Sequence, residues 1–261
     1  MNFNKEMVTD VIKNTKIVDA VHYFKTIDST QNYAQKNLNK HDGSFIVYAE
    51  HQSQGRGRFK REWISPGARG IYMSVVWRPN IDISEMTKFN YHISLAIARS
   101  IQTTFNLDVK IKWPNDIYIE HKKVCGFLSE IVTDNGKIAA VICGIGINLR
   151  HSEAIQALGT ATSISESSKN EKLNYEIFFQ QLIAELKRAY EDFISDKFLN
   201  IKSEWLDYTN VFDHELTINE YNNSYKAKAL AIDENGFLKV VDQEGNIKKV
   251  ISADIELDSG D

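Results

Sequence analysis

The chain has few residues of the kinds that disulfides, zinc sites and membrane anchors require. Among 261 residues there are two cysteines, Cys125 and Cys143, and both lie in apolar, strand-like runs. We expect a buried thiol at each position rather than a disulfide, and a structural zinc site would need more ligands. The longest apolar stretch, residues 138–149, is too short and too rich in glycine to span a bilayer. Residues 1–6 contain no apolar signal region, so a soluble, cytoplasmic protein without a membrane partner is expected.

Several standard catalytic motifs are absent as well. The sequence contains no G-x-x-x-x-G-K-[ST] phosphate loop, no G-x-G-x-x-G dinucleotide motif and no G-x-S-x-G nucleophile turn. Histidines such as His22, His51 and His92 lack a metal-ligand spacing, which favours structural or surface roles. A net charge of -4 and a pI near 6.0 argue against nucleic acid as the main partner. They still allow a local basic pocket.

What is present indicates an ordinary globular chain of one or two domains, with 43% apolar and 25% charged residues. Periodicity predicts strands near 21–24, 45–50, 71–77, 109–112, 117–119, 124–132 and 138–147, and helices near 31–38, 85–105, 175–194 and 198–205. After Tyr208, short alternating runs separated by Asn-Gly and Gly-Asn turns indicate a small antiparallel barrel or sandwich. We therefore expect an α+β fold with domains at 1–208 and 209–261.

The most informative stretch is residues 52–63, QSQGRGRFKREW, which follows a predicted strand. Glycine lets a backbone approach a ligand closely, and guanidinium groups match carboxylate and phosphate oxygens. Ordering about ten residues costs roughly 10–20 kcal/mol, whereas one charged hydrogen bond returns about 1.5–3 kcal/mol. We expect a loop that is loose when empty and ordered over a bound anion. On this stretch alone, a basic surface loop or a nucleic-acid patch remains an equal alternative.

Two further clusters suit a polar ligand. Ser29-Thr30-Gln31 at a helix start offers hydroxyls, an amide and free backbone N–H groups, although helix capping is the commoner use of Ser-Thr. Lys112-Trp113-Pro114-Asn115-Asp116 lies between two strands and can present its last two side chains to a nucleotide or a metal. Its alternative is a simple turn, because Asn-Asp is common turn chemistry.

The last two clusters lie on predicted strands. Lys123-Val124-Cys125-Gly126 places a lysine in a strand that should be buried, with a solvated edge lysine as the alternative. Gly144-Ile145-Gly146-Ile147-Asn148 alternates glycines along a strand, which allows close approach of a flat ligand, and its Asn148 can read an adenine edge. Taken alone, this run is equally a tightly packed strand.

With these clusters in this order, the chain closely resembles the biotin–protein ligases, also called biotin holocarboxylase synthetases. The resemblance is strong over about residues 24–149. It implies a mixed-sheet catalytic domain similar to the class II tRNA synthetase core, followed by a small SH3-like barrel. The implied reaction uses MgATP to convert biotin into biotinyl-5′-AMP and then transfers the biotinyl group to a lysine of a biotin carboxyl carrier protein domain.

The resemblance also implies roles for individual residues. Ser29, Thr30, Gln31 and Gln52 correspond to contacts of the biotin head group. Arg56, Gly57 and Arg58 correspond to the loop that closes over the ligand, and Lys123 to the lysine at the biotin carboxylate and the acyl-phosphate oxygens. The adenylate side is implied for the following residues: Trp63, Asn115, Asp116 and Asn148. Asp116 is also a candidate magnesium ligand, and Lys123 and Arg58 are the implied catalytic residues.

This sequence departs from the family pattern in two places. Gln31 stands where many members have asparagine; the longer amide keeps the same donors and acceptors. About twenty residues precede the core, too few for the winged helix-turn-helix repressor domain of bifunctional members, so we expect a ligase that does not repress transcription. A homodimer through the sheet edge at residues 132–142 is a further expectation. The alternatives are a lipoate–protein ligase, a nucleic-acid-binding module and a catalytically inactive ligand sensor.

Overall fold

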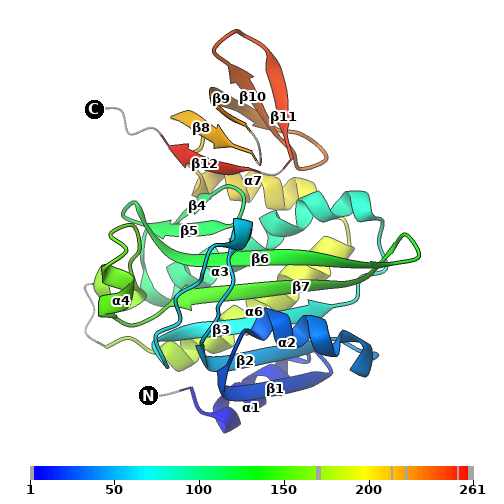
Figure 1. Ribbon diagram of the computed structural model, residues 1–261, viewed down its shortest axis with the longest axis vertical. Helices are drawn as coiled ribbons and strands as arrows, with labels where there is room; N and C mark the ends of the chain where they lie inside the picture. Colours follow the sequence, from blue (N-terminus) through cyan, green and yellow to red (C-terminus); the bar gives the residue numbers. More distant parts are fainter. Residues whose placement is uncertain (1–2, 169–171, 213, 221–222, 252, 258–261) are drawn as a thin grey trace.

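The computed structural model describes residues 3–168, 172–212, 214–220, 223–251 and 253–257. A seven-stranded mixed sheet carries helices on both faces, and a smaller five-stranded sheet lies beyond it (Figure 1). The large sheet has the order β1-β2-β3-β7-β6-β5-β4, in which β1 and β2 are parallel and the other neighbours antiparallel. Its strands are β1 (Ala20–Ile27), β2 (Phe45–Gln52), β3 (Gly70–Trp77), β4 (Lys110–Lys112), β5 (Asp116–Ile119), β6 (Lys122–Asp134) and β7 (Lys137–Asn148).

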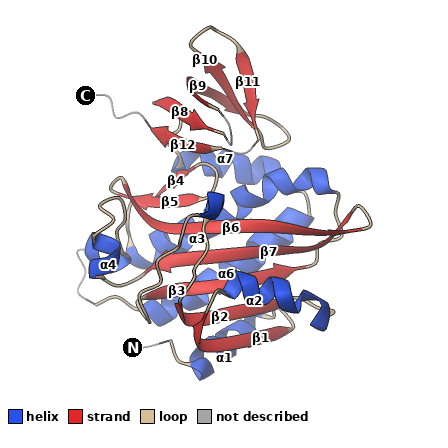
Figure 2. Ribbon diagram, viewed as in Figure 1, coloured by secondary structure: helices blue, strands red, loops and turns tan. Residues whose placement is uncertain are grey.

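The helices form two layers around this sheet, as Figure 2 shows. Their bounds are α1 (Lys5–Thr15), α2 (Thr30–Asn37), α3 (Met86–Phe105), α4 (Glu153–Gln156), α5 (Ile164–Ser167), α6 (Tyr175–Ile194) and α7 (Phe198–Tyr208). The apolar stripe predicted for 85–105 is confirmed on α3, where Phe89, Ile93 and Ile97 are fully buried. Each such side chain contributes about 1.5–3 kcal/mol on burial. Thus α3 and α6 cover one face, and α2 packs on the other.

The β6–β7 hairpin is long and its turn is the predicted one. Asn135 and Gly136 both have positive φ, 49° and 77°, as a two-residue hairpin turn requires. Because β5 pairs with β6 only as far as Gly126, the part of β6 beyond Phe127 has no described strand on its outer side. Within the predicted 132–142 edge, β7 pairs with β6 on one side and meets its β3 partner only from Val141 onward, so residues 137–140 of β7 also lack a described strand on their other side.

The C-terminal residues form a five-stranded antiparallel sheet in the order β11-β10-β9-β8-β12. Its strands are β8 (Glu215–Asn219), β9 (Ser224–Ile232), β10 (Leu238–Asp242), β11 (Ile247–Val250) and β12 (Asp254–Leu257). Among the described residues, the edge strands β11 and β12 do not pair with each other, so the expected closure into a barrel is not observed. The strand β12 was not predicted from the sequence, and its Asp254 pairs with Arg58 and Arg61 of the loop after β2.

Neither cysteine is exposed. Cys125 and Cys143 are free and fully buried, as expected, and burial raises the pKa of the Cys143 thiol to about 12. No helix within the described ranges is both long and apolar enough to cross a membrane.

His92 on α3 makes folding stability depend on pH. It is 1% exposed, neither ring nitrogen has a partner among the described residues, and burial lowers its pKa to about 4. The unfolded chain therefore takes up this proton near pH 6.5, well before the folded chain does, and stability is lost as pH falls from about 6.5 to 4. Relative to a His92→Leu variant, the wild type should lose roughly 2–3 kcal/mol between pH 7.5 and 4.5 in urea unfolding. If the free energies of unfolding of the wild type and of His92→Leu changed with pH in parallel, this expectation would be wrong.

Candidate active site

The predicted functional residues converge on one cavity of about 330 Å³, within the range of small-ligand pockets. Its walls come from the start of α2, the loop after β2, the β4–β5 turn, β6, β7 and β12. All twelve residues with a predicted role line it: Ser29, Thr30, Gln31, Gln52, Arg56, Gly57, Arg58, Trp63, Asn115, Asp116, Lys123 and Asn148. The structure thus brings together segments separated by more than a hundred residues.

One end of the cavity is a buried polar network at the start of α2. Ser29 caps this helix by accepting from the backbone N–H of Asn32, so the capping interpretation is correct even though Ser29 also lines the cavity. Gln52 Oε1 accepts from the backbone N–H of Thr30 at 2.8 Å and from its hydroxyl at 3.0 Å. The Thr30 hydroxyl also lies 2.9 Å from the Ser74 hydroxyl. These fixed hydroxyl and amide groups suit a small, neutral, polar head group.

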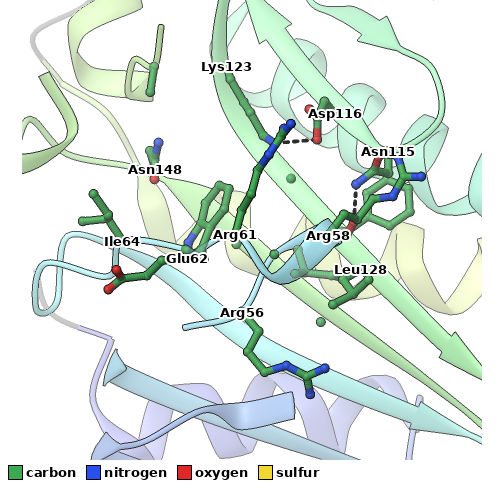
Figure 3. A pocket seen from close by; sticks show the side chains of 18 of the residues that line it. Arg56, Arg58, Arg61, Glu62, Ile64, Asn115, Asp116, Lys123, Leu128 and Asn148 are labelled. Carbon is green, nitrogen blue, oxygen red and sulfur yellow. Dashed lines mark hydrogen bonds and ion pairs between the residues drawn. The ribbon is translucent and has the colours of Figure 1, made fainter. Parts of the chain in front are cut away.

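The cavity is also lined by the charged pair Lys123–Asp116. Lys123 enters β6 and its Nζ lies 2.6 Å from Asp116 Oδ1 (Figure 3). The side chain of Lys123 is 30% exposed and that of Asp116 is 21% exposed, so both are partly buried. A second cation, Lys112, is half-buried beside them, and burial lowers its pKa. These cations can stabilise negative charge that develops on a ligand in the cavity.

The glycine- and arginine-rich loop lies over the cavity and is tied to both sheets. Arg58 begins a 3-10 turn, Arg58–Lys60, and donates to Asn115 Oδ1 at 3.0 Å and to the carbonyl of Ala253 at 3.1 Å. It also lies 3.5 Å from Asp254 on β12, which pairs with Arg61 at 2.5 Å. Burial lowers the pKa of Arg58, and Asp254 and Asp116 oppose that shift. The C-terminal sheet therefore holds the loop in place.

A further part of the cavity is a flat wall built on two glycines. The Trp63 ring lies against Gly146 of β7 and Gly126 of β6: a Cβ on these residues would come within 2.3 Å and 3.1 Å of the ring. Asn148, buried beside them, donates to the carbonyl of Thr162 at 3.0 Å. Its Oδ1 is buried and no described residue donates to it. An aromatic plane beside a free amide acceptor suits a base with an exocyclic amine.

Replacing Gly146 with alanine should displace Trp63, because the new Cβ cannot fit under the ring. We expect the KM for ATP in pyrophosphate exchange to rise by roughly tenfold, the worth of about one base–aromatic stack. The KM for biotin should change little, since the polar end of the cavity is untouched. In a Trp63→Ala background the same glycine substitution should add almost nothing. Additive losses would contradict the packing explanation.

Three residues of the site were missed by the sequence analysis. Ser74 on β3 and Glu130 on β6 join the polar network, and Asp254 on β12 holds the loop. Neither Ser74 nor Glu130 stands in a motif, and both follow strand alternation, which indicates only that they share a face with neighbours two positions away. Asp254 lies about two hundred residues from the arginines it contacts. No signal in the sequence could have found it.

Known proteins resemble the chain over the same segments. Residues 23–148 match the Biotin/lipoate A/B protein ligase family. The bifunctional ligase/repressor BirA of Bacillus spizizenii is 35% identical over 240 residues, which span 90% of this chain and 73% of that protein. A biotin--[acetyl-CoA-carboxylase] ligase of Paracoccus denitrificans is 28% identical over 184 residues, 69% of this chain and 76% of the relative.

Among solved structures, the biotin protein ligase of Aquifex aeolicus in complex with biotin and ATP superimposes with a TM-score of 0.75. The match covers 92% of this chain and 98% of that one, at 24% identity. This likeness supports the α+β fold with its mixed sheet. The cavity geometry, the family match and the relationship to the Bacillus protein agree, and the chain belongs to the biotin protein ligases of the Biotin/lipoate A/B protein ligase family.

Proposed function

We propose that this chain activates biotin with MgATP and attaches it to a lysine of a biotin carboxyl carrier protein domain. In the first step, the biotin carboxylate attacks the α-phosphate, a carbon–oxygen–phosphorus anhydride forms and pyrophosphate leaves. In the second step, the ε-amine of the carrier lysine attacks the biotinyl carbonyl, an amide forms, and AMP leaves with the amine giving up its proton. No nucleophile on the enzyme is needed.

The observation that carries this proposal is that three kinds of chemistry line one cavity. They are the neutral polar network at Thr30 and Gln52, the cation Lys123 and the aromatic ring of Trp63. These suit, respectively, a biotin head group, a reacting carboxylate with its phosphate, and an adenine. Since carboxylate and triphosphate repel each other, the attack needs cations at the junction. Lys123 and Arg58 are the residues proposed to supply them.

The nucleotide side is proposed for Trp63, Asn115, Asp116 and Asn148. Asn115 is proposed to act on the nucleotide through Arg58. Its side chain donates to the carbonyl of Phe127 at 2.6 Å and accepts from Arg58. Magnesium enters as part of the substrate MgATP. Asp116 is the proposed protein ligand of this ion, whose other ligands would be phosphate oxygens and water.

The loop containing Arg56, Gly57 and Arg58 is proposed to retain the adenylate. A mixed anhydride hydrolyses readily, so excluding water protects the intermediate. The contacts of Arg58 to Asn115 and Ala253 give the loop a closed position over the cavity.

We further propose that the chain acts without repressing transcription, with no nucleic-acid partner. In support, α1 packs on α6 and β1 and buries Val8, Val11 and Ile12 in the main core, so it is part of the catalytic region. Domain limits of 1–208 and 209–261, an SH3-like character for the C-terminal unit, a cytoplasmic location and a homodimer through the open edge of β6 belong to the same proposal.

Pyrophosphate exchange tests the first half-reaction. The protein is incubated with MgATP, radiolabelled pyrophosphate and either biotin or lipoate, and label is followed into ATP. Exchange that requires biotin supports the proposal. Exchange that requires lipoate assigns the chain to the sister activity of the family, and silence from folded protein with both acids favours a sensor.

A further inference from the structure

Glu130 occupies a position between two concave surfaces. It lies on β6 outside the ligand cavity and lines a second groove under the loop, which it shares with Arg56 and Leu128. Its side chain is 28% exposed. Each carboxylate oxygen has a different partner: Oε2 accepts from Gln31 Nε2 at 2.9 Å, and Oε1 accepts from Arg56 Nη2 at 2.8 Å. One carboxylate therefore joins the cavity to the loop.

The contacts of Gln31 determine which way its amide points. Its nitrogen donates to Glu130 Oε2 and to the carbonyl of Ile142 at 3.1 Å. A carboxylate and a carbonyl can only accept, so the amide nitrogen must face them and the oxygen must face the other way. That oxygen accepts from the Ser74 hydroxyl at 3.0 Å and lies against Gly144, where a Cβ would approach it to 2.6 Å. Gln31 therefore presents its amide oxygen, a hydrogen-bond acceptor, to the cavity.

We propose that Glu130 is a positioning residue for the head group of the acid substrate. Glu130 holds the Gln31 amide so that the amide oxygen faces the cavity. There this oxygen accepts from an N–H of the cyclic urea of biotin. Glu130 also connects the Gln31 amide to Arg56 of the loop. The inference builds on the proposed biotin ligase function. A cyclic urea offers two N–H donors, whereas the dithiolane of lipoate offers none, so the fixed acceptor selects between the two acids.

The contact to Arg56 extends this arrangement to the loop. Arg56 donates through Nη1 to Asn32 Oδ1 at 3.0 Å and through Nη2 to Glu130, so it spans from α2 to β6. Arg56 and Gln31 therefore share one acceptor group. The two partners use different oxygens of Glu130, so a substitution that keeps the oxygen facing Arg56 changes the contact to Gln31 alone.

The test is Glu130→Gln, which keeps the shape but leaves one acceptor oxygen. Arg56 retains that oxygen because a cation binds it more strongly, and the new amide nitrogen then faces Gln31 and forces its amide to rotate. By titration calorimetry without ATP, the Kd for biotin should rise by about tenfold to a hundredfold. The Kd for desthiobiotin, which has the same urea, should rise by the same factor. The matched control is Asp134→Asn, the same substitution at an exposed position of β6.

Three readouts separate positioning from a general structural role. The KM for ATP, and kcat at saturating biotin, should stay within about twofold of wild type, whereas a damaged fold would shift them all. In a Gln31→Ala background, which already lacks the amide, Glu130→Gln should add almost no further loss. Unchanged biotin affinity, or losses that add fully in the double variant, would overturn the inference. A wild type that binds no biotin would overturn the proposed function itself.

Discussion

Replacing Lys123 with alanine is expected to remove nearly all biotin-dependent pyrophosphate exchange while leaving the protein folded. The ammonium group lies in the cavity, 2.6 Å from Asp116 and 5.6 Å from the centre of the Trp63 ring. Without it, Asp116 adds a negative charge where two anionic substrates must meet. The loss should be about a hundredfold to a thousandfold in kcat, the range for removing one preorganised group that stabilises developing charge. The rate of pyrophosphate exchange at saturating biotin and MgATP measures this loss in kcat.

Lys122 is the matched control for this substitution. It precedes Lys123 on the same strand but is exposed and does not line the cavity. Lys122→Ala should keep normal exchange, and both variants should unfold near the wild-type temperature. Near-normal exchange in Lys123→Ala would show that the reacting carboxylate has another partner, and the role proposed for this lysine would have to be abandoned.

The second large effect is expected from Arg58→Gly, which should release the adenylate into solution. Arg58 connects the loop to Asn115 on one side and to Ala253 and Asp254 on the other, and its side chain is only 17% exposed. Glycine removes all of these contacts and adds backbone freedom. We expect biotin to appear on lysines of a bystander protein such as serum albumin, at a rate at least about tenfold above wild type, given two or more lost charge-assisted hydrogen bonds.

Lys60→Gly provides the comparison for Arg58. Lys60 lies in the same 3-10 turn, is exposed and has a φ of 61°, a value that glycine adopts readily. The Lys60→Gly substitution removes one positive charge from the loop but leaves the contacts of Arg58 to Asn115 and β12 in place. Bystander labelling should remain at the wild-type level in Lys60→Gly. If Arg58→Gly retains the adenylate as well as wild type does, the loop closes by other contacts.

These expectations assign different tasks to neighbouring basic residues. Lys123 acts on the reacting atoms, Arg58 holds the loop closed, and Arg56 is anchored through Glu130 to the head-group end. The tasks can be separated in experiments because they change different quantities: kcat, adenylate release and biotin affinity. The sequence motif alone gives no reason to distinguish Arg56 from Arg58.

The sequence by itself determined the local elements and identified residues that line one cavity. The second long helix was predicted at 175–194, and the structure places α6 at Tyr175–Ile194. The hairpin turn at Asn135-Gly136 and the burial of both cysteines were also correct. All twelve predicted site residues line one cavity. Hydrophobic periodicity, turn residues and short motifs depend on neighbours along the chain, which is why one sequence was enough.

The tertiary structure alone decided which distant segments meet. The strand order places β7 between β3 and β6, so that Gly144 and Gly146 face Gln31 and Trp63. It brings β12 against the arginine loop, leaves the small sheet open among the described residues, and lets Glu130 serve two partners at once. Contacts of this kind join residues about a hundred or two hundred positions apart. Local preference does not encode them; they follow from how the sheet orders its strands and buries its faces.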